Sequence, residues 1–225
     1  MEKIMDKIIP SLLSEEHSIA YGIFEGKTYP HEALPFISEF IINKGKTLDP
    51  EIFDNPQEGV WIARSARVAP TAYIDAPCII DENAEVRHCA FIRGSAIVGK
   101  GAVVGNSTEL KNVILFDGVQ VPHYNYVGDS ILGYKAHLGA GAITSNVKSD
   151  KSLVAISYGG ERFSSGMKKL GAILGDCAEI GCGSVLNPGS VIGKNANVYP
   201  LSSVRGYVAS NSIYKKAGEI VQKDR

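Results

Sequence analysis

Three features that would each have indicated a class of protein are missing from this sequence. Charge of one sign is not in excess, because 23 lysines and arginines stand against 24 aspartates and glutamates. This balance argues against partners such as nucleic acid or an anionic membrane surface. The N-terminal residues lead into no long apolar run, so we expect neither a signal peptide nor a membrane span, and a cytoplasmic protein.

The third missing feature is a tight cysteine pair. The chain has four cysteines, Cys78, Cys89, Cys177 and Cys182, and none of them forms a C-x-x-C motif. A structural zinc or redox site is therefore not expected, and no metal is expected at all. We interpret the cysteines as reduced and mostly structural. With 225 residues and 44% apolar content, the chain is long enough for one domain and a smaller appendage.

A repeat of six residues runs through most of the chain. From Ile62 onward every sixth residue is aliphatic, as far as Leu110, and a second series of mostly small residues follows four positions after each of them. Both series return between Leu174 and Ser202. A fixed short period of this kind is typical of a solenoid in which three short strands form each turn of about 18 residues. The repeat therefore predicts a mostly β protein that coils into a three-sided parallel β-helix.

The remaining segments do not follow the repeat. Residues 1–57 contain two apolar stripes with helical spacing, one from Ile4 to Leu13 and one from His31 to Ile42. We predict that they form a small helical cap, which hides the open edge of the first coil; a partner-docking arm is the alternative. The β-helix is expected at 58–206, with an inserted basic loop at 145–171 over an active site. Residues 207–225 are expected to form a C-terminal tail, either solvated or acting as a clamp on a phosphorylated ligand.

The three-sided winding places several polar residues together, provided that the units Leu110–Leu115 and Val127–Leu132 are five residues long. Arg93 and Lys111 then stack on one face, where two cations attract an anion. The other candidates are Asn146 on the same face, His123 and Tyr126 on the segment leading into it, and His137 at the matching place one coil later. Each of these residues alone is commonly solvated or structural. Their expected convergence on one groove favours a functional site.

Three segments carry a resemblance to a known family. They are Gly105-Asn106-Ser107-Thr108-Glu109-Leu110-Lys111-Asn112, Pro122-His123-Tyr124-Asn125-Tyr126-Val127-Gly128-Asp129-Ser130, and Leu138-Gly139-Ala140-Gly141-Ala142-Ile143-Thr144-Ser145-Asn146. This block resembles the acetyltransferase domain of the bifunctional glucosamine-1-phosphate N-acetyltransferase and N-acetylglucosamine-1-phosphate uridyltransferase, and the resemblance extends over roughly residues 60 to 205. The stretch from Lys168 to Asp176 is closer to the archaeal-type sugar nucleotidyltransferases. Proteins with this repeat coil left-handedly, so the resemblance implies a left-handed β-helix.

The resemblance also implies a function. It indicates an acetyl-CoA-dependent N-acetyltransferase that acts on an amino sugar 1-phosphate in nucleotide-sugar biosynthesis, as a homotrimer with acetyl-CoA between subunits. By motif matching, His123 is the general base, a task that suits imidazole because this group titrates near neutral pH. Arg93, Lys111 and Tyr126 hold the sugar phosphate, Asn146 orients the amine or the thioester, and His137 contacts the sugar. The acetyl-CoA contacts are implied at Ala140, Cys182 and Pro200.

The sequence departs from the family pattern at four places. His137 replaces an asparagine that binds the sugar, so the sugar preference can differ. Ser145-Asn146-Val147-Lys148 replaces a Cys-Asn-Tyr-Asp-like run, and Pro122 replaces a glycine before the base and stiffens the turn. Residues 1–57 contain no G-x-G-T-R-M motif, so we expect the nucleotidyltransferase domain to be lacking.

Two other functions compete with this interpretation. A γ-type carbonic anhydrase would use the same coil, but its closely spaced G-H-x-x-x-x-H pair is missing, because position 128 is glycine. His88 and His123 alone do not provide that zinc site. The stronger alternative is a noncatalytic protein that binds a sugar phosphate or sugar nucleotide, or a scaffold for a separate nucleotidyltransferase. It predicts ligand binding without turnover.

Overall fold

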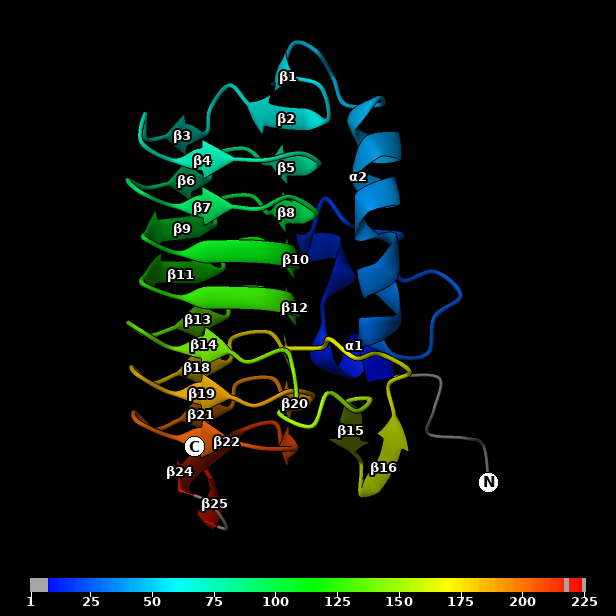
Figure 1. Ribbon diagram of the computed structural model, residues 1–225, viewed down its shortest axis with the longest axis vertical. Coiled ribbons are helices and arrows are strands. Elements are labelled where there is room, and N and C mark those ends of the chain that lie inside the picture. The colour runs from blue at the N-terminus through cyan, green and yellow to red at the C-terminus, as the bar shows by residue number, and fades with distance from the viewer. Residues whose placement is uncertain (1–7, 217–218, 224–225) are drawn as a thin grey trace.

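The structure is a computed structural model that describes residues 8–216 and 219–223. The start of the first predicted helical stripe, from Ile4 to Lys7, and the tail residues 217–218 and 224–225 lie outside the described residues. The rest of the chain forms a three-sided prism of short parallel strands, with helices along one side (Figure 1).

Each side of the prism is a stack of strands from successive coils. We number the sides by the strands that they contain. The first face contains β4 (Tyr73–Ile74), β7 (Phe91–Ile92), the start of β10 (Glu109–Leu115) and of β12 (Tyr126–Leu132), β14 (Ile143–Thr144), β19 (Val185–Leu186) and β22 (Ser203–Val204). The second face contains β3 (Arg67–Val68), β6 (Glu85–Val86), β9 (Val103–Asn106), β11 (Gln120–His123), β13 (His137–Leu138), β18 (Glu179–Ile180), β21 (Asn197–Val198) and β24 (Ser212–Lys216). The third face contains β2 (Val60–Ala63), β5 (Cys78–Ile80), β8 (Ala96–Val98), the ends of β10 and β12, β17 (Ala172–Leu174), β20 (Ser190–Ile192) and β23 (Tyr207–Val208).

The register confirms the predicted shortening of two units. Ile92 pairs with Leu110, 18 residues later, but Val98 pairs with Leu115, only 17 residues later. The same shortening recurs where Val127 and Leu132 end a unit, because Leu110 pairs with Val127 and Leu115 with Leu132. Strands of the first face run from left to right in front of the prism while the chain descends (Figure 1), so the coil is left-handed, as predicted.

The aliphatic series fills the prism. Val86, Ile92, Val98, Val104 and Leu110 are at most 1% exposed, and the small residues of the second series, such as Ala84 and Ala102, are buried at the corners. Burial of one such side chain contributes about 1.5–3 kcal/mol. Ile62, Val68 and Ile74 in the first coils are only partly buried, because no coil precedes them.

The chain turns sharply at the corners of the coil. Gly101 and Gly141 have φ of +65° and +69°, as their predicted turn role requires. Many other corners place an ordinary side chain in the left-handed region, including Asn112 at +53°, Tyr124 at +52° and Asp129 at +47°. Asn and Asp tolerate this conformation better than most residues, whereas tyrosine does not, so the packing of the coil imposes it at Tyr124.

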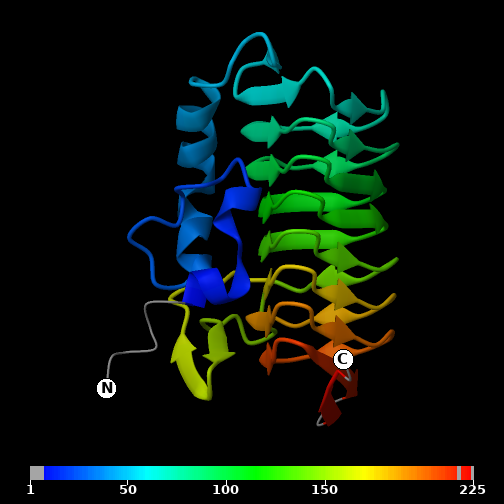
Figure 2. The same ribbon diagram turned by 180° about the vertical axis from the view of Figure 1, so that it is seen from behind.

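The N-terminal segment forms the predicted helices but does not cover the end of the coil. It contains α1 (Ile8–Leu12), the 3₁₀ helices η2 (Glu15–His17) and η3 (Pro30–Phe36), and α2 (Ile37–Gly45). Helix α2 packs along the third face, on β5, β8 and β10 (Figures 1 and 2). The edge of the first coil is instead paired with β1 (Phe53–Gln57), which runs antiparallel to β2. The helices therefore cover a side of the prism and not its open edge.

Residues 145–171 leave the coil, as predicted, between β14 and β17. They carry a hairpin of β15 (Ala155–Tyr158) and β16 (Glu161–Ser164), and β15 lies against β20 and β23. The coil continues past residue 206, because β23 pairs with β20 and β24 pairs with β21. An antiparallel strand, β25 (Glu219–Gln222), then closes the C-terminal edge.

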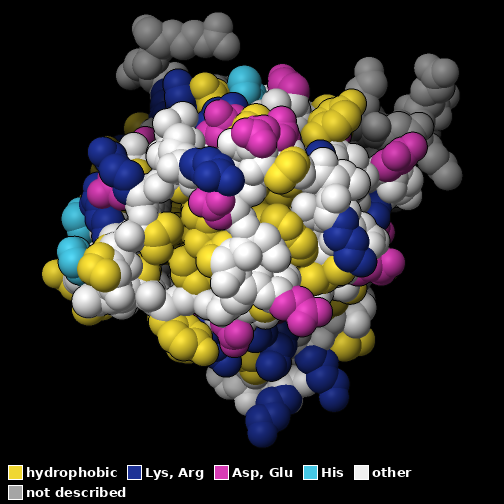
Figure 3. All heavy atoms as spheres, turned by 90° about the horizontal axis from the view of Figure 1, so that it is seen from above, with side chains coloured by type: hydrophobic (Ala, Val, Ile, Leu, Met, Phe, Trp, Pro, Cys, Tyr) yellow, Lys and Arg dark blue, Asp and Glu magenta, His cyan; other side chains and the backbone are white. Residues whose placement is uncertain are grey.

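Two other sequence features can be placed in the structure. All four cysteines are free; Cys78 is buried on the third face, where burial raises the pKa of its thiol to about 12, and Cys89 and Cys182 are exposed. Basic and acidic side chains are interspersed on the surface seen from above the first coil (Figure 3). No helix among the described residues has the length and apolarity that crossing a bilayer requires.

Candidate active site

Four of the predicted site residues lie one above another along one corner of the coil, between the second and first faces. We call this set, His123, Ala140, Cys182 and Pro200, the histidine column. Main-chain hydrogen bonds link its successive rungs: Gly141 N–H donates to His123 O (3.0 Å), Gly183 N–H to Ala140 O (2.8 Å), and Leu201 N–H to Cys182 O (2.9 Å). The proposed base and the proposed cofactor contacts therefore share one edge.

The corner that presents His123 is held by a buried side chain. Asn125 is 2% exposed, and its amide donates to Gly139 O and Ala142 O of the next coil, each at 2.9 Å. Its Oδ1 accepts the His123 N–H at 3.1 Å. These bonds fix the main chain on both sides of Tyr124, while the His123 side chain is exposed. An exposed imidazole on a fixed backbone is accessible to a ligand.

A second group of predicted residues gathers at the opposite margin of the first face. Lys111 Nζ lies 3.3 Å from Asp129 Oδ2, and the Asn146 amide donates to the same oxygen at 2.5 Å and to the Tyr126 hydroxyl at 3.1 Å. Asn112 donates to Asp129 Oδ1 at 3.1 Å. We call this group the Asp129 cluster. It joins three of the predicted residues through a carboxylate that the sequence interpretation did not single out.

Asp129 could have been found from spacing. Asn112, Asp129 and Asn146 are 17 residues apart, which is the length of the two shortened coils, so they stack at one corner. A carboxylate between two amides one coil away on either side is placed to accept hydrogen bonds from both. The Asp129 side chain is only 7% exposed, and such a buried charge requires several donors.

The Tyr126 hydroxyl is placed to donate a hydrogen bond. Burial, followed by the nearby negative charge of Asp129, raises the pKa of Tyr126 above its ordinary value, so the phenol stays protonated at neutral pH. Its oxygen accepts the Asn146 amide proton. The phenolic proton is therefore available for an oxygen atom of a ligand.

Arg93 lies one coil before Lys111, as predicted. Its N–H donates to Leu110 O at 2.9 Å, and its guanidinium makes a 2.7 Å ion pair with Glu109. The Arg93 side chain is 45% exposed, so this pair is worth little to stability, and part of the guanidinium can contact another group.

The structure does not place His137 where the sequence interpretation expected it. His137 pairs with Gln120 in the register, so Ala140 and not His137 lies one coil after His123. The reason is the 17-residue coil, which shifts the matching position by three residues from His137 to Ala140. His137 Nδ1 lies 2.8 Å from Glu179 Oε2 on the second face.

Within one chain the predicted residues thus form two groups rather than one groove. The histidine column precedes the first-face strand, and Lys111 follows it, since Lys111 pairs with Gly128 and His123 pairs with Asn106. The hydrogen bonds of the described residues join Lys111, Tyr126 and Asn146, and they link neither His123 nor His137 to that cluster.

The histidine that suggested a carbonic anhydrase has another contact. His88 lies two coils before His123 at the same corner, and its Nδ1 is 2.9 Å from Thr71 Oγ1. It borders a hollow of about 860 Å³ on the second face, beside Arg87 and Asn106. No three side chains with metal-ligating atoms come together in the part of the chain that the structure describes.

The fold and these two groups define the class: a left-handed β-helix of hexapeptide repeats with polar residues along two edges of one face. Comparison with known protein families matches residues 74–159, less than half of the chain, to the GMPPB C-terminal domain. The bifunctional protein GlmU of Methanococcus maripaludis is 35% identical over 134 residues, which are 59% of this chain and 32% of that protein. A bifunctional sugar-1-phosphate nucleotidylyltransferase/acetyltransferase of Sulfurisphaera tokodaii is 32% identical over 126 residues, which are 56% of this chain and 31% of that protein.

The predicted resemblance is therefore confirmed. The chain spans about a third of the length of these curated relatives. Among solved structures, a hexapeptide transferase family protein from Anaplasma phagocytophilum is similar with a TM-score of 0.42 and 17% identity, over 75% of this chain and 82% of that one.

Proposed function

We propose that this chain is an acetyl-CoA-dependent N-acetyltransferase that acts on an amino sugar 1-phosphate in nucleotide-sugar biosynthesis, in the cytoplasm. The histidine column is the observation that supports this most directly, because one exposed imidazole lies in line with three successive corner positions suited to an extended cofactor. The relatives are named for sugar-1-phosphate nucleotidylyltransferase and acetyltransferase activities.

The reaction assigns a task to each group. The amine of the sugar attacks the thioester carbonyl, so a C–N bond forms and the C–S bond of acetyl-CoA breaks. His123 accepts the proton lost by the amine and returns it to the departing CoA sulfur. Arg93, Lys111 and Tyr126 bind the phosphate, because two cations and a phenolic proton match its oxygens. Asn146 orients the amine or the thioester.

The surroundings of the histidine column suit an extended cofactor. The corner residues next to Ala140 and Cys182 are Gly141 and Gly183, so no side chain projects there. A Cβ at Gly141 would meet nothing within 4 Å. A pantetheine arm running along the coil axis would pass Ala140, Cys182 and Pro200 in turn.

The separation of the two groups supports a homotrimer in this proposal. The histidine column lies on one margin of the first face and the Asp129 cluster on the other. A neighbouring copy would bring a histidine column against an Asp129 cluster and complete the site between subunits. His137, paired with Glu179, would contact the sugar from the second face.

A thiol-release assay tests the proposal. The purified chain is incubated with acetyl-CoA and a panel of amino sugar 1-phosphates, starting with glucosamine 1-phosphate, and free CoA is measured. We expect CoA release that depends on both substrates. Saturable binding of the sugar phosphate without CoA release would instead support a noncatalytic binding protein or a scaffold for a separate nucleotidyltransferase.

A further inference from the structure

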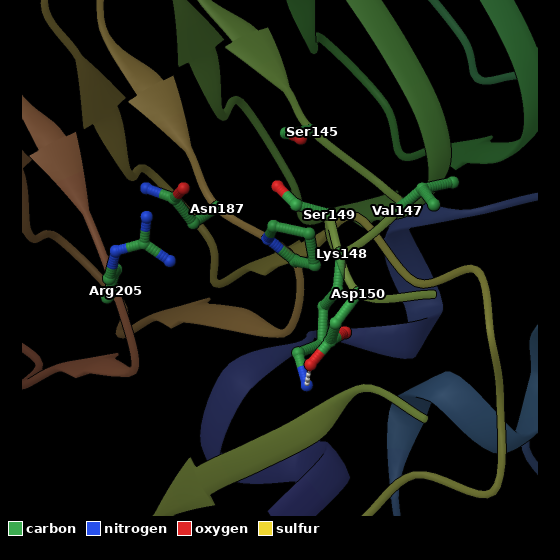
Figure 4. A pocket seen from close by; sticks show the side chains of 8 residues that line it. Ser145, Val147, Lys148, Ser149, Asp150, Asn187 and Arg205 are labelled. Carbon is green, nitrogen blue, oxygen red and sulfur yellow. Dashed lines mark ion pairs between the residues drawn. The ribbon is translucent and has the colours of Figure 1, made fainter. Parts of the chain in front are cut away.

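The inserted segment encloses a hollow at the corner between the first and third faces. The hollow has a volume of about 350 Å³ and lies between the β15–β16 hairpin and the ends of β19 and β22. We call it the basic hollow and define it by Lys148, Ser157, Arg162, Asn187 and Arg205. Figure 4 shows Arg205 beside Asn187, across from the chain that leaves the coil at Lys148.

Three cations and no carboxylate line the basic hollow. Lys148 is paired with Asp150 at 3.3 Å, on the side of an adjoining hollow of about 310 Å³. Within residues 8–216 and 219–223, neither Arg162 nor Arg205 has a carboxylate within ion-pairing distance. Two guanidinium groups that share a hollow repel each other, and an anion between them removes that repulsion.

The hollow is formed by ordered parts of the chain. Val154 and Ile156 of the insertion are buried, and the Tyr158 hydroxyl lies 2.7 Å from Ser11 Oγ. The Tyr158 ring also packs against Tyr207, with ring centroids 4.8 Å apart. On the other side, the Asn187 amide is held by bonds to Ser203 Oγ (3.0 Å) and Val204 O (2.8 Å). Preformed walls lower the ordering cost of binding.

The basic hollow is separate from the proposed acceptor site. Lys111, Gly128, Ser145, Asn187 and Arg205 occupy one outer column, so four coils separate Lys111 from Arg205. At about 4.8 Å per coil this corresponds to about 19 Å. A single phosphate cannot bridge both positions.

We propose that the basic hollow binds the phosphate group of a small phosphorylated ligand. The planar guanidinium groups of Arg162 and Arg205 match phosphate oxygens in pairs, and Ser157 and Asn187 add neutral hydrogen-bonding groups. The volume of about 350 Å³ accommodates more than an inorganic ion and falls in the range of small-molecule sites. The phosphate could belong to the bisphosphorylated nucleotide end of a cofactor or to a sugar phosphate, and this site does not depend on the proposed catalysis.

Titration calorimetry with pyrophosphate tests this site in the wild type and in four variants. Arg162→Ala and Arg205→Ala remove the two guanidinium groups, and Arg67→Ala removes an equally charged group whose side chain is 80% exposed at the other end of the coil. Lys111→Ala removes the proposed acceptor contact. We expect Arg162→Ala and Arg205→Ala each to weaken binding about tenfold or more, since each loses charged hydrogen bonds. Arg67→Ala and Lys111→Ala should retain a wild-type binding event.

The outcomes that overturn the proposal are distinct. Lack of saturable binding to the wild type, equal weakening by Arg67→Ala, or loss in Lys111→Ala with none in Arg205→Ala would each do so. The last result would place the anion at the acceptor site instead. Competition by adenosine 3′,5′-bisphosphate and by glucosamine 1-phosphate then identifies the source of the phosphate, because the true ligand class displaces pyrophosphate at lower concentration. Far-UV circular dichroism checks that each variant is folded.

Discussion

Lys111 and Asp129, on adjacent coils, form an ion pair in which Nζ lies 3.3 Å from Oδ2. The carboxylate is 7% exposed and the lysine 27% exposed, so the pair lies at the boundary of the protein interior. Asp129 also receives the amides of Asn112 and Asn146. One buried carboxylate therefore positions two residues assigned to the site.

Replacement of Asp129 should destabilise the protein. Asp129→Ala leaves three donors without their acceptor and should lower the free energy of unfolding by about 2 kcal/mol, less than for a fully buried pair because Lys111 reaches solvent. Asp129→Asn should cost less, because asparagine tolerates the φ of +47° at this position. Urea denaturation measures both. The control is Asp54→Ala, which breaks a pair exposed by more than half on both sides and should change stability by about 0.5 kcal/mol or less. A cost for Asp129→Ala no greater than that of the control would contradict this role.

Gly128 should matter for ligand binding more than for folding. A Cβ at this position would collide with the Tyr126 hydroxyl and lie 2.9 Å from Asn146 Nδ2, both of which are the ends of side chains. Gly128→Ala should displace Tyr126 and raise the KM for the acceptor about tenfold or more, since a hydrogen bond to the phosphate is lost. Steady-state kinetics and thermal unfolding measure the two effects.

Gly105 provides the contrasting case. A Cβ there would collide with the main-chain atoms of Pro122, which cannot move without shifting the coil. Gly105→Ala should therefore lower stability by about 2 kcal/mol or more. If Gly128→Ala also unfolded the protein while the KM stayed the same, the assignment of Tyr126 would lose its support.

Stability should fall as pH rises through the titration of Asp81. Burial, together with the charges of Asp117 and Glu82, raises the pKa of Asp81 above its ordinary value, although the Glu82 N–H and Lys100 oppose this. The folded state then binds more protons than the unfolded state between the ordinary and the raised pKa, so stability is lost as pH rises across that interval. Asp81→Asn keeps an acceptor for the Glu82 N–H and should be more stable than the wild type at pH 7. Denaturation from pH 4 to 7 checks this prediction: the difference should shrink toward pH 4, and a constant difference would contradict it.

Much of the fold could be predicted because the repeat is visible in single residues. The aliphatic and small series located the coils, and the 17-residue steps at Leu115 and Leu132 followed from the spacing alone. The direction of the N-terminal helices could not be predicted in this way. An amphipathic stripe shows that α2 buries one face, but it does not show whether that face meets the end or the side of the prism.

The candidate site was predictable only in part. Stacking of Arg93 on Lys111 follows from the period, and so does the histidine column, once coil lengths are known. The register also explains the error at His137, where a match by motif was taken for a match by position. Asp129 and the basic hollow depend on side-chain contacts between segments such as residues 145–171 and the coil, which no period describes.

The central claim is that His123 is the base of an acetyl transfer, and one comparison tests it most directly. His88 lies at the same corner two coils earlier and serves as the matched control. CoA release from acetyl-CoA with an amino sugar 1-phosphate should fall roughly a hundredfold or more in His123→Ala, because general-base catalysis is lost, and should stay at the wild-type rate in His88→Ala. Binding of acetyl-CoA should be retained in both variants. Wild-type CoA release by His123→Ala would contradict the account.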